Sequence, residues 1–173
     1  MRLHPPSGVR PHALTVPEYM AEQTERMGDS LAHFIETSPQ EKLNWRPALE
    51  GSAPTRSILE QVSECVVVNR LIARLLSEGS PPKMPNPQSP ALEFKDAQEA
   101  QQMVRESANA LAKSVRAMSA EDLNRTFQHP RGAFLGRNLI MMCLRNMAYH
   151  AGQINYIQIL AGDSEFHVPP KWR

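Results

Sequence analysis

The chain has 173 residues, and its 19 lysines and arginines against 18 aspartates and glutamates give a formal net charge of +1. This balance argues against a general nucleic-acid binder and against a protein held to anionic membranes by charge. No run of about 18 apolar residues predicts a membrane-spanning helix. The two cysteines, Cys65 and Cys143, offer no disulfide framework, which favours a cytoplasmic protein.

Prolines divide the chain into an expected N-terminal tail, residues 1–14, and one domain, residues 15–173. Within that domain, four proline-free stretches have apolar residues at the spacing of a helix. They are residues 18–38, 55–78, 93–128 and 136–162.

Several local patterns predict where these helices begin and end. Thr15, followed three residues later by Glu18, predicts a capping box before the first helix. Gly79 is expected to take the left-handed conformation after the second helix, and it opens a Pro-rich surface loop over residues 79–90. Ser119-Ala-Glu-Asp122 predicts a cap that opens a short turn.

No segment shows the alternation of a strand or the turn pattern of a hairpin, so we expect an all-α fold. Helices of about 20 to 27 residues would be roughly 30–40 Å long. An antiparallel four-helix bundle would bury their apolar faces.

The second predicted helix has a carboxylate where an apolar residue is expected. Glu64 falls on one line with Val68, Leu71 and Leu75, within the apolar segment VSECVVV. A carboxylate buried there needs a partner, a metal ion or its own proton.

The fourth predicted helix carries Asn146 and His150 at positions i and i+4 on a similar line. They are about 6 Å apart along the helix axis, a separation at which two side chains can bind one ion. Cys143 is about 10.5 Å from His150 along the axis, too far to share that ion. Gly152, inside the same helix, is expected where another helix packs closely.

The segment His150-Ala-Gly-Gln153, followed by Ile154-Asn-Tyr-Ile157, resembles the signature of the DinB/YfiT-like family. Trp45-Arg-Pro47 and the segment Arg56–Gln61 extend the resemblance, which covers residues 15–173. It implies a four-helix bundle with three metal-binding histidines, one on the second helix and two on the fourth. It also implies metal-dependent reactions, including transfer and isomerisation with low-molecular-weight thiols.

Carried over residue by residue, the family's histidine positions fall on Glu64, Asn146 and His150, so only one of the three is a histidine here. The resemblance therefore implies a Glu/Asn/His site for Zn²⁺ or Ni²⁺, or less favourably Mn²⁺ or Fe²⁺. Gln61, one turn before Glu64, is expected to support a ligand as a hydrogen-bond donor.

Two hypotheses follow for the function. The first is a metal-dependent transferase or hydrolase acting on a small molecule, with a thiol among the candidate substrates. The second is a metal-free bundle that binds a small ligand or a partner, in which Glu64 and His150 satisfy each other as an ion pair. In both cases we expect a homodimer, from the resemblance and from the Met and Tyr residues on the outer faces of the helices.

Overall fold

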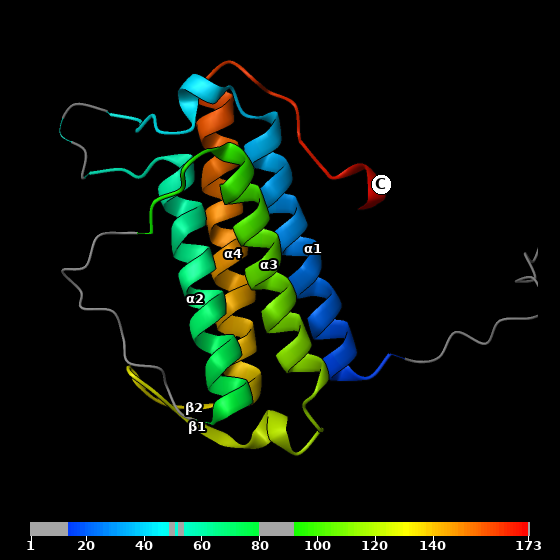
Figure 1. Cartoon of the computed structure of the whole chain (residues 1–173). Helices are drawn as coiled ribbons and strands as arrows, with labels where there is room; N and C mark the ends of the chain where they lie inside the picture. Colours follow the sequence, from blue (N-terminus) through cyan, green and yellow to red (C-terminus); the bar gives the residue numbers. More distant parts are fainter. Residues whose placement is uncertain (1–13, 49–50, 52–53, 80–91, 173) are drawn as a thin grey trace, which may run out of the picture.

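The computed structural model describes residues 14–48, 51, 54–79 and 92–172. Its four long helices are α1 (Val16–Thr37), α2 (Ile58–Glu78), α3 (Ala97–Arg116) and α4 (Gly136–Leu160) (Figure 1). The expected four-helix bundle is confirmed. None of the helices in these ranges has the length and apolarity needed to span a membrane. Most of the expected N-terminal tail, and residues 80–90 of the Pro-rich loop, lie outside the described residues.

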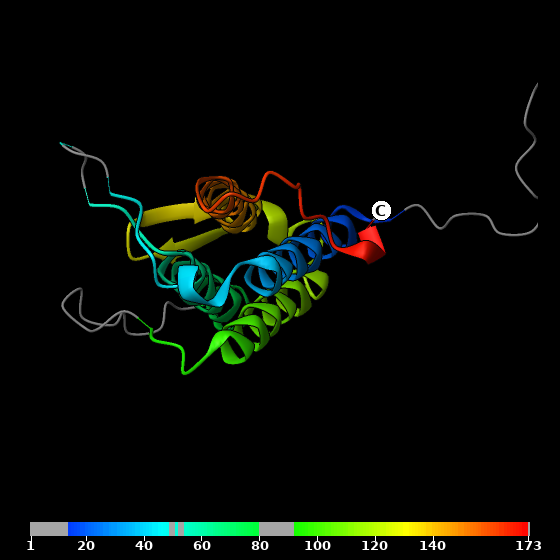
Figure 2. The ribbon, with the colours of Figure 1, turned by 90° about the horizontal axis from the view of Figure 1, so that it is seen from above.

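Around the bundle axis the helices follow the order α1, α3, α2, α4, so each helix packs against two others (Figure 2). The colours in Figure 1 show that α1 and α4 run in one direction and α2 and α3 in the other. The neighbours α1–α3 and α2–α4 are therefore antiparallel, as expected. The neighbours α2–α3 and α1–α4 are parallel, although α2 and α3 follow each other in the chain.

Side-chain caps fix the starts of α1 and α2. Thr15 Oγ1 accepts the Glu18 N–H at 3.3 Å, and the Glu18 carboxylate accepts the Thr15 N–H at 2.7 Å, which confirms the predicted capping box. Ser57 and Glu60 form the same reciprocal pair before α2, at 3.3 and 2.9 Å. At the other end of α2, Gly79 has a φ of 73°, as predicted for a left-handed cap.

Two clusters of buried aliphatic side chains form the core, one toward each end of the bundle. Their fully buried members include Ile72, Leu75, Leu111, Val115, Leu139 and Ile140 in one, and Leu31, Ile35, Ile58, Val62, Val104 and Ile154 in the other. The second cluster underlies the N-terminal half of α2 and the C-terminal half of α4, and these two segments hold the candidate site.

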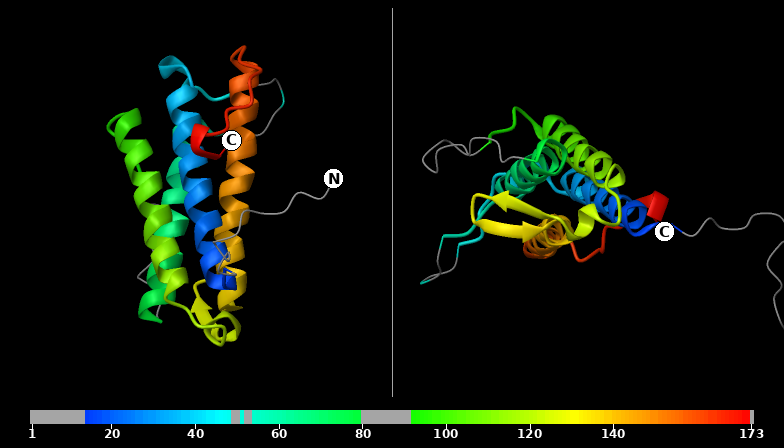
Figure 3. Two further views of the ribbon diagram at one scale, coloured as in Figure 1. Left: turned by 90° about the vertical axis from the view of Figure 1, so that its right-hand side faces the viewer. Right: turned by 90° about the horizontal axis from the view of Figure 1, so that it is seen from below.

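A hairpin over residues 126–135 corrects the expectation that the chain has no strand. Strands β1 (Thr126–His129) and β2 (Gly132–Leu135) pair antiparallel at the end of the bundle where α4 begins (Figure 3). The expectation that no strand is present was wrong. The helix α3 ends at Arg116, before the proline-free stretch 93–128 does, and the predicted turn at Ser119–Asp122 follows it. The strands have four residues each; Phe127 is buried in the core, and Phe134 packs against it. Strands of four residues are too short to show a clear alternation of apolar and polar residues in the sequence, so they could not be predicted from it.

Three single turns of 3-10 helix complete the described chain: η1 (Gln40–Lys42), η2 (Asp122–Asn124) and η3 (Pro170–Trp172). The predicted cap before η2 is present, because Ser119 Oγ accepts the Asp122 N–H at 3.1 Å and donates to the Asp122 carboxylate at 2.9 Å.

Candidate metal and substrate site

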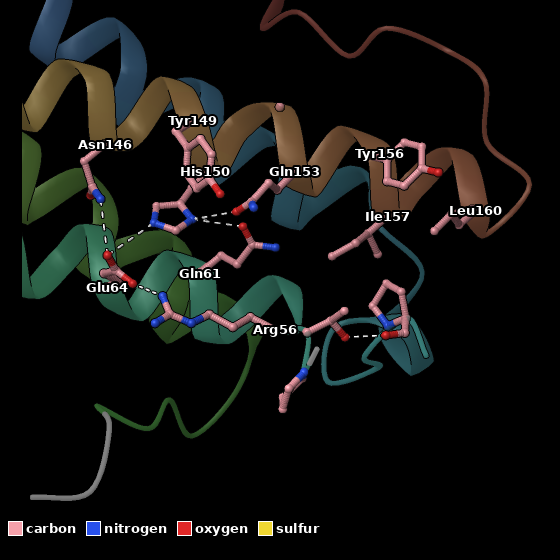
Figure 4. A pocket seen from close by; sticks show the side chains of 14 residues that line it. Arg56, Gln61, Glu64, Asn146, Tyr149, His150, Gln153, Tyr156, Ile157 and Leu160 are labelled. Atoms are coloured by element: carbon pink, nitrogen blue, oxygen red, sulfur yellow. Dashed lines mark hydrogen bonds and ion pairs between the residues drawn. The ribbon is translucent and has the colours of Figure 1, made fainter. Parts of the chain in front are cut away.

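A pocket of about 880 Å³ lies between the start of α2 and the C-terminal half of α4 (Figure 4). Its size is typical of a site for a small molecule. Polar side chains gather at one end: Arg56, Gln61, Glu64, Asn146, His150 and Gln153. Tyr156, Ile157 and Leu160 form an apolar end, and Pro47 and Pro54 add to the lining.

The three residues singled out from the sequence lie together at the polar end. Glu64 Oε1 is 3.6 Å from His150 Nε2 and accepts the Asn146 amide Nδ2 at 3.4 Å. The expectation that Glu64 is buried in a dry core was wrong, since 37% of its side chain is exposed. Glu64 lines the pocket, whereas Leu75 on the same line of α2 is fully buried in the core, and Val68 and Leu71 pack against that core.

Two glutamine side chains hold the His150 ring in one orientation. Nδ1 lies 2.9 Å from Gln61 Oε1 and 3.2 Å from Gln153 Oε1, and both oxygens are acceptors. Nδ1 therefore carries the ring proton, which leaves a lone pair on Nε2. Gln61 contacts the histidine, but it accepts a hydrogen bond there, whereas a donor was expected from the sequence. The Tyr149 ring also meets the imidazole in a T-shaped arrangement, with 5.3 Å between the ring centroids.

The pocket keeps His150 uncharged near neutral pH. Burial is the main cause that lowers its pKa below the ordinary value of 6.5, and the positive charge of Arg56 lowers it further, against the hydrogen bond with Gln153. With Nδ1 bonded to the glutamines, the Nε2 lone pair of this neutral ring faces the Glu64 carboxylate. Two electron-pair donors facing each other in this way are stabilised when a cation lies beside both.

Arg56 supplies one such positive charge. Its guanidinium forms an ion pair with the Glu64 carboxylate, reaching it from the residue that precedes the Ser57 cap of α2. The role of Arg56, like that of Gln153, was not predicted from the sequence, although both residues lie in the segments that carry the family resemblance.

The side chains at the polar end of the pocket can be compared with the ligands that a divalent metal ion requires. Within the described ranges, no group of three His, Cys, Asp or Glu side chains is placed to share one ion, so a third protein ligand at this site would be an amide oxygen, and Asn146 lies beside Glu64. The buried Oδ1 of Asn146 has no hydrogen-bond partner among the described residues. Rotation of the Asn146 side-chain amide by half a turn would place Oδ1 beside the Glu64 carboxylate. Two oxygen acceptors repel each other there unless a cation lies between them.

The spacing of the two stronger donors also fits a metal ion. Two ligands of one tetrahedral Zn²⁺, each about 2.0–2.2 Å from it, are roughly 3.3–3.6 Å apart. His150 Nε2 and Glu64 Oε1 are 3.6 Å apart. The set therefore fits a divalent ion, with lower affinity than three imidazoles because an amide oxygen is a weaker ligand for Zn²⁺ or Ni²⁺.

The two cysteines take no part in this site. Both are buried free thiols, and neither lines the pocket. Burial raises the pKa of Cys65 to about 12 and also raises the pKa of Cys143. A thiol with so high a pKa is neither a ready nucleophile nor a ready metal ligand near neutral pH.

Fold and site together define a four-helix bundle with a polar pocket on its second and fourth helices. The sequence profile of the DinB superfamily matches residues 23–154, which is more than half of the chain. The protein belongs to the DinB superfamily. No curated protein is similar enough in sequence to match the chain.

Solved structures support the fold. YfiT from Bacillus subtilis, described as a probable metal-dependent hydrolase with an unusual four-helix bundle topology, is 14% identical with a TM-score of 0.66. That match covers 94% of this chain and 95% of YfiT. The DinB-like protein YjoA from Bacillus subtilis is 14% identical with a TM-score of 0.64, over 87% of this chain and 96% of YjoA. A conserved protein from Enterococcus faecalis is 12% identical with a TM-score of 0.67, over 87% of this chain and 100% of that one.

Proposed function

We propose that the protein is a metal-dependent hydrolase or transferase that acts on a small molecule in the pocket between α2 and α4. The observation that carries the proposal is the neutral His150 ring, whose Nδ1–H is held by two glutamine oxygens and whose Nε2 lone pair faces Glu64. A histidine that donates its other ring N–H to a neighbouring acceptor is the usual arrangement of a metal ligand. The description of YfiT supports the hydrolase class.

In this proposal His150 Nε2 and the Glu64 carboxylate are the main ligands, and Asn146 Oδ1 is the third. Gln61 and Gln153 fix the tautomer and the direction of the imidazole. Zn²⁺ or Ni²⁺ suits the imidazole best, and Mn²⁺ or Fe²⁺ suits the set less well. A divalent ion held there supplies Lewis acidity to an oxygen or thiol group of the substrate. The apolar end with Tyr156, Ile157 and Leu160 binds the body of that substrate.

A second candidate function is a metal-free pocket that binds a small ligand. The ion pair of Arg56 with Glu64 favours it, because the guanidinium neutralises the carboxylate without any metal. Here His150 and Asn146 would act only as hydrogen-bonding groups toward the ligand.

Calorimetric titration of the chelator-treated protein with Zn²⁺ and with Ni²⁺ separates the two functions. A metal-dependent enzyme should bind one equivalent, and His150→Ala should abolish the binding. His129→Ala is the control, because His129 is also mostly buried but lies in β1, outside the pocket. Absence of binding to wild type, or equal binding to His150→Ala, would overturn the metal proposal.

A further inference from the structure

The ion pair between Arg56 and Glu64 uses the same carboxylate that the proposed metal site requires. A metal ion and the guanidinium would therefore compete for it. With His150 neutral, Glu64 and Arg56 cancel each other's charge, so the metal-free site has no net charge. A divalent ion on Glu64 would raise the net charge at the polar end to +2, with Arg56 still beside it.

We propose that Arg56 is an exchangeable counter-ion: it neutralises Glu64 while no metal is bound, and it binds an anionic group of the substrate once a metal ion takes Glu64. This inference rests on the proposed metal site and assigns its substrate class. That class is a small molecule with an apolar body and a carboxylate or phosphate group.

The surroundings of Arg56 suit such an exchange. Its backbone is held on both sides, because Thr55 Oγ1 donates to the Pro47 carbonyl and Ser57 caps α2. The Arg56 side chain itself is 56% exposed, at the edge of the pocket. A long, mostly exposed side chain on a fixed backbone can change partners by rotation about its own bonds.

The chemistry of the guanidinium identifies the ligand group. Its N–H donors form a planar fork that matches a carboxylate or a phosphate, and such charge-assisted pairs are stronger than neutral hydrogen bonds. In Figure 4 the Arg56 side chain runs along α2 toward Glu64, while Tyr156, Ile157 and Leu160 lie toward the other end of the pocket. One ligand can therefore use the guanidinium and the apolar end together.

The test compares Arg56→Gln with Arg46→Gln. Arg46 pairs with Glu60 at the same end of α2, and its side chain is 60% exposed. Both substitutions remove one positive charge and one exposed ion pair, but only Arg56 lies at the pocket. In calorimetric titration, Arg56→Gln should bind Zn²⁺ about tenfold more tightly than wild type, the order expected when a unit charge a few ångströms from a divalent ion is removed. Arg46→Gln should stay close to wild type.

The second arm uses benzoate as the anionic probe on the zinc-loaded proteins. Arg56→Gln should bind benzoate about tenfold more weakly than Arg46→Gln, which corresponds to one lost hydrogen bond between charged groups. Equal Zn²⁺ affinity in the two variants would overturn the exchange, and equal benzoate affinity would overturn the substrate role. Zinc binding by Arg56→Gln but not by wild type would support the exchange. No zinc binding by either protein would instead refute the metal site on which the inference rests.

Discussion

Two glycines inside helices, Gly28 of α1 and Gly152 of α4, should respond in opposite ways to the same substitution by alanine. A Cβ built on Gly28 would lie 2.4 Å from the Cβ of Ala108, where α1 packs on α3. A Cβ built on Gly152 would meet nothing within 4 Å. Close helix packing was expected at Gly152 from the sequence, and that expectation was wrong, because the close contact is at Gly28.

The expected changes in stability follow from two effects, helix propensity and packing. Alanine is more favourable than glycine inside a helix by about 0.8–1.0 kcal/mol, because it restricts the unfolded chain. Gly152→Ala gains this term alone, so its melting temperature should rise by about 2–4 °C. Gly28→Ala gains the same term but must push α1 and α3 apart, and overpacking of this kind costs about 1–3 kcal/mol. With so short a contact we expect a net loss of about 1–2 kcal/mol and a melting temperature about 2–8 °C lower.

Thermal melts followed by circular dichroism at 222 nm measure both changes. The double variant Gly28→Ala/Ala108→Gly removes the methyl group that clashes, so it should recover most of the stability lost in Gly28→Ala. If Gly28→Ala melts at or above the wild-type temperature, or if Gly152→Ala is destabilised, the packing argument for these helices is refuted.

Three further predictions concern the site, the thiols and the assembly. Because burial lowers the pKa of His150, the unfolded chain takes up a proton below about pH 6.5 that the folded pocket resists, so the metal-free protein should lose stability as the pH falls from 6.5. In melts between pH 7 and 5, His150→Gln should lose less stability than wild type, and an equal loss would contradict this role of the pocket. Cys65 and Cys143 should react with a thiol reagent only after unfolding, and fast labelling of the native protein would show that they are accessible. Light scattering should give about twice the mass of one chain, and Met141→Glu, on the exposed face of α4, should yield monomers; a monomeric wild type would refute the dimer.

Local sequence patterns predicted the helices well because each one depends on neighbours in the chain. The Thr15–Glu18 capping box and the left-handed Gly79 need only residues within one helical turn. The hairpin at residues 126–135 could not be found in this way. Its connection through Pro130 and Arg131 lacks the Asn-Gly type of pattern that makes short hairpins recognisable.

The candidate site was predicted where helical spacing and the family resemblance agreed. Asn146 and His150 lie on one face of α4 by their i, i+4 spacing, and Glu64 stood out as a carboxylate within an apolar segment of the second helix. The resemblance placed the three residues in one site. The ion pair of Arg56 could not be predicted, because Arg56 precedes the α2 cap and periodicity says nothing about the direction of a side chain outside a helix. The exposure of Glu64 depends on the pocket between α2 and α4, which is a property of the packed bundle.

If His150 and Glu64 together hold a divalent cation, anomalous diffraction from crystals grown with one equivalent of Zn²⁺ will locate it. We expect a single strong peak about 2.0–2.2 Å from both His150 Nε2 and a Glu64 carboxylate oxygen. Asn146 should turn its Oδ1 toward that peak, and Arg56 should no longer be paired with Glu64. A zinc ion bound elsewhere on the chain, or no zinc and an intact Arg56–Glu64 pair, would contradict the proposed metal site.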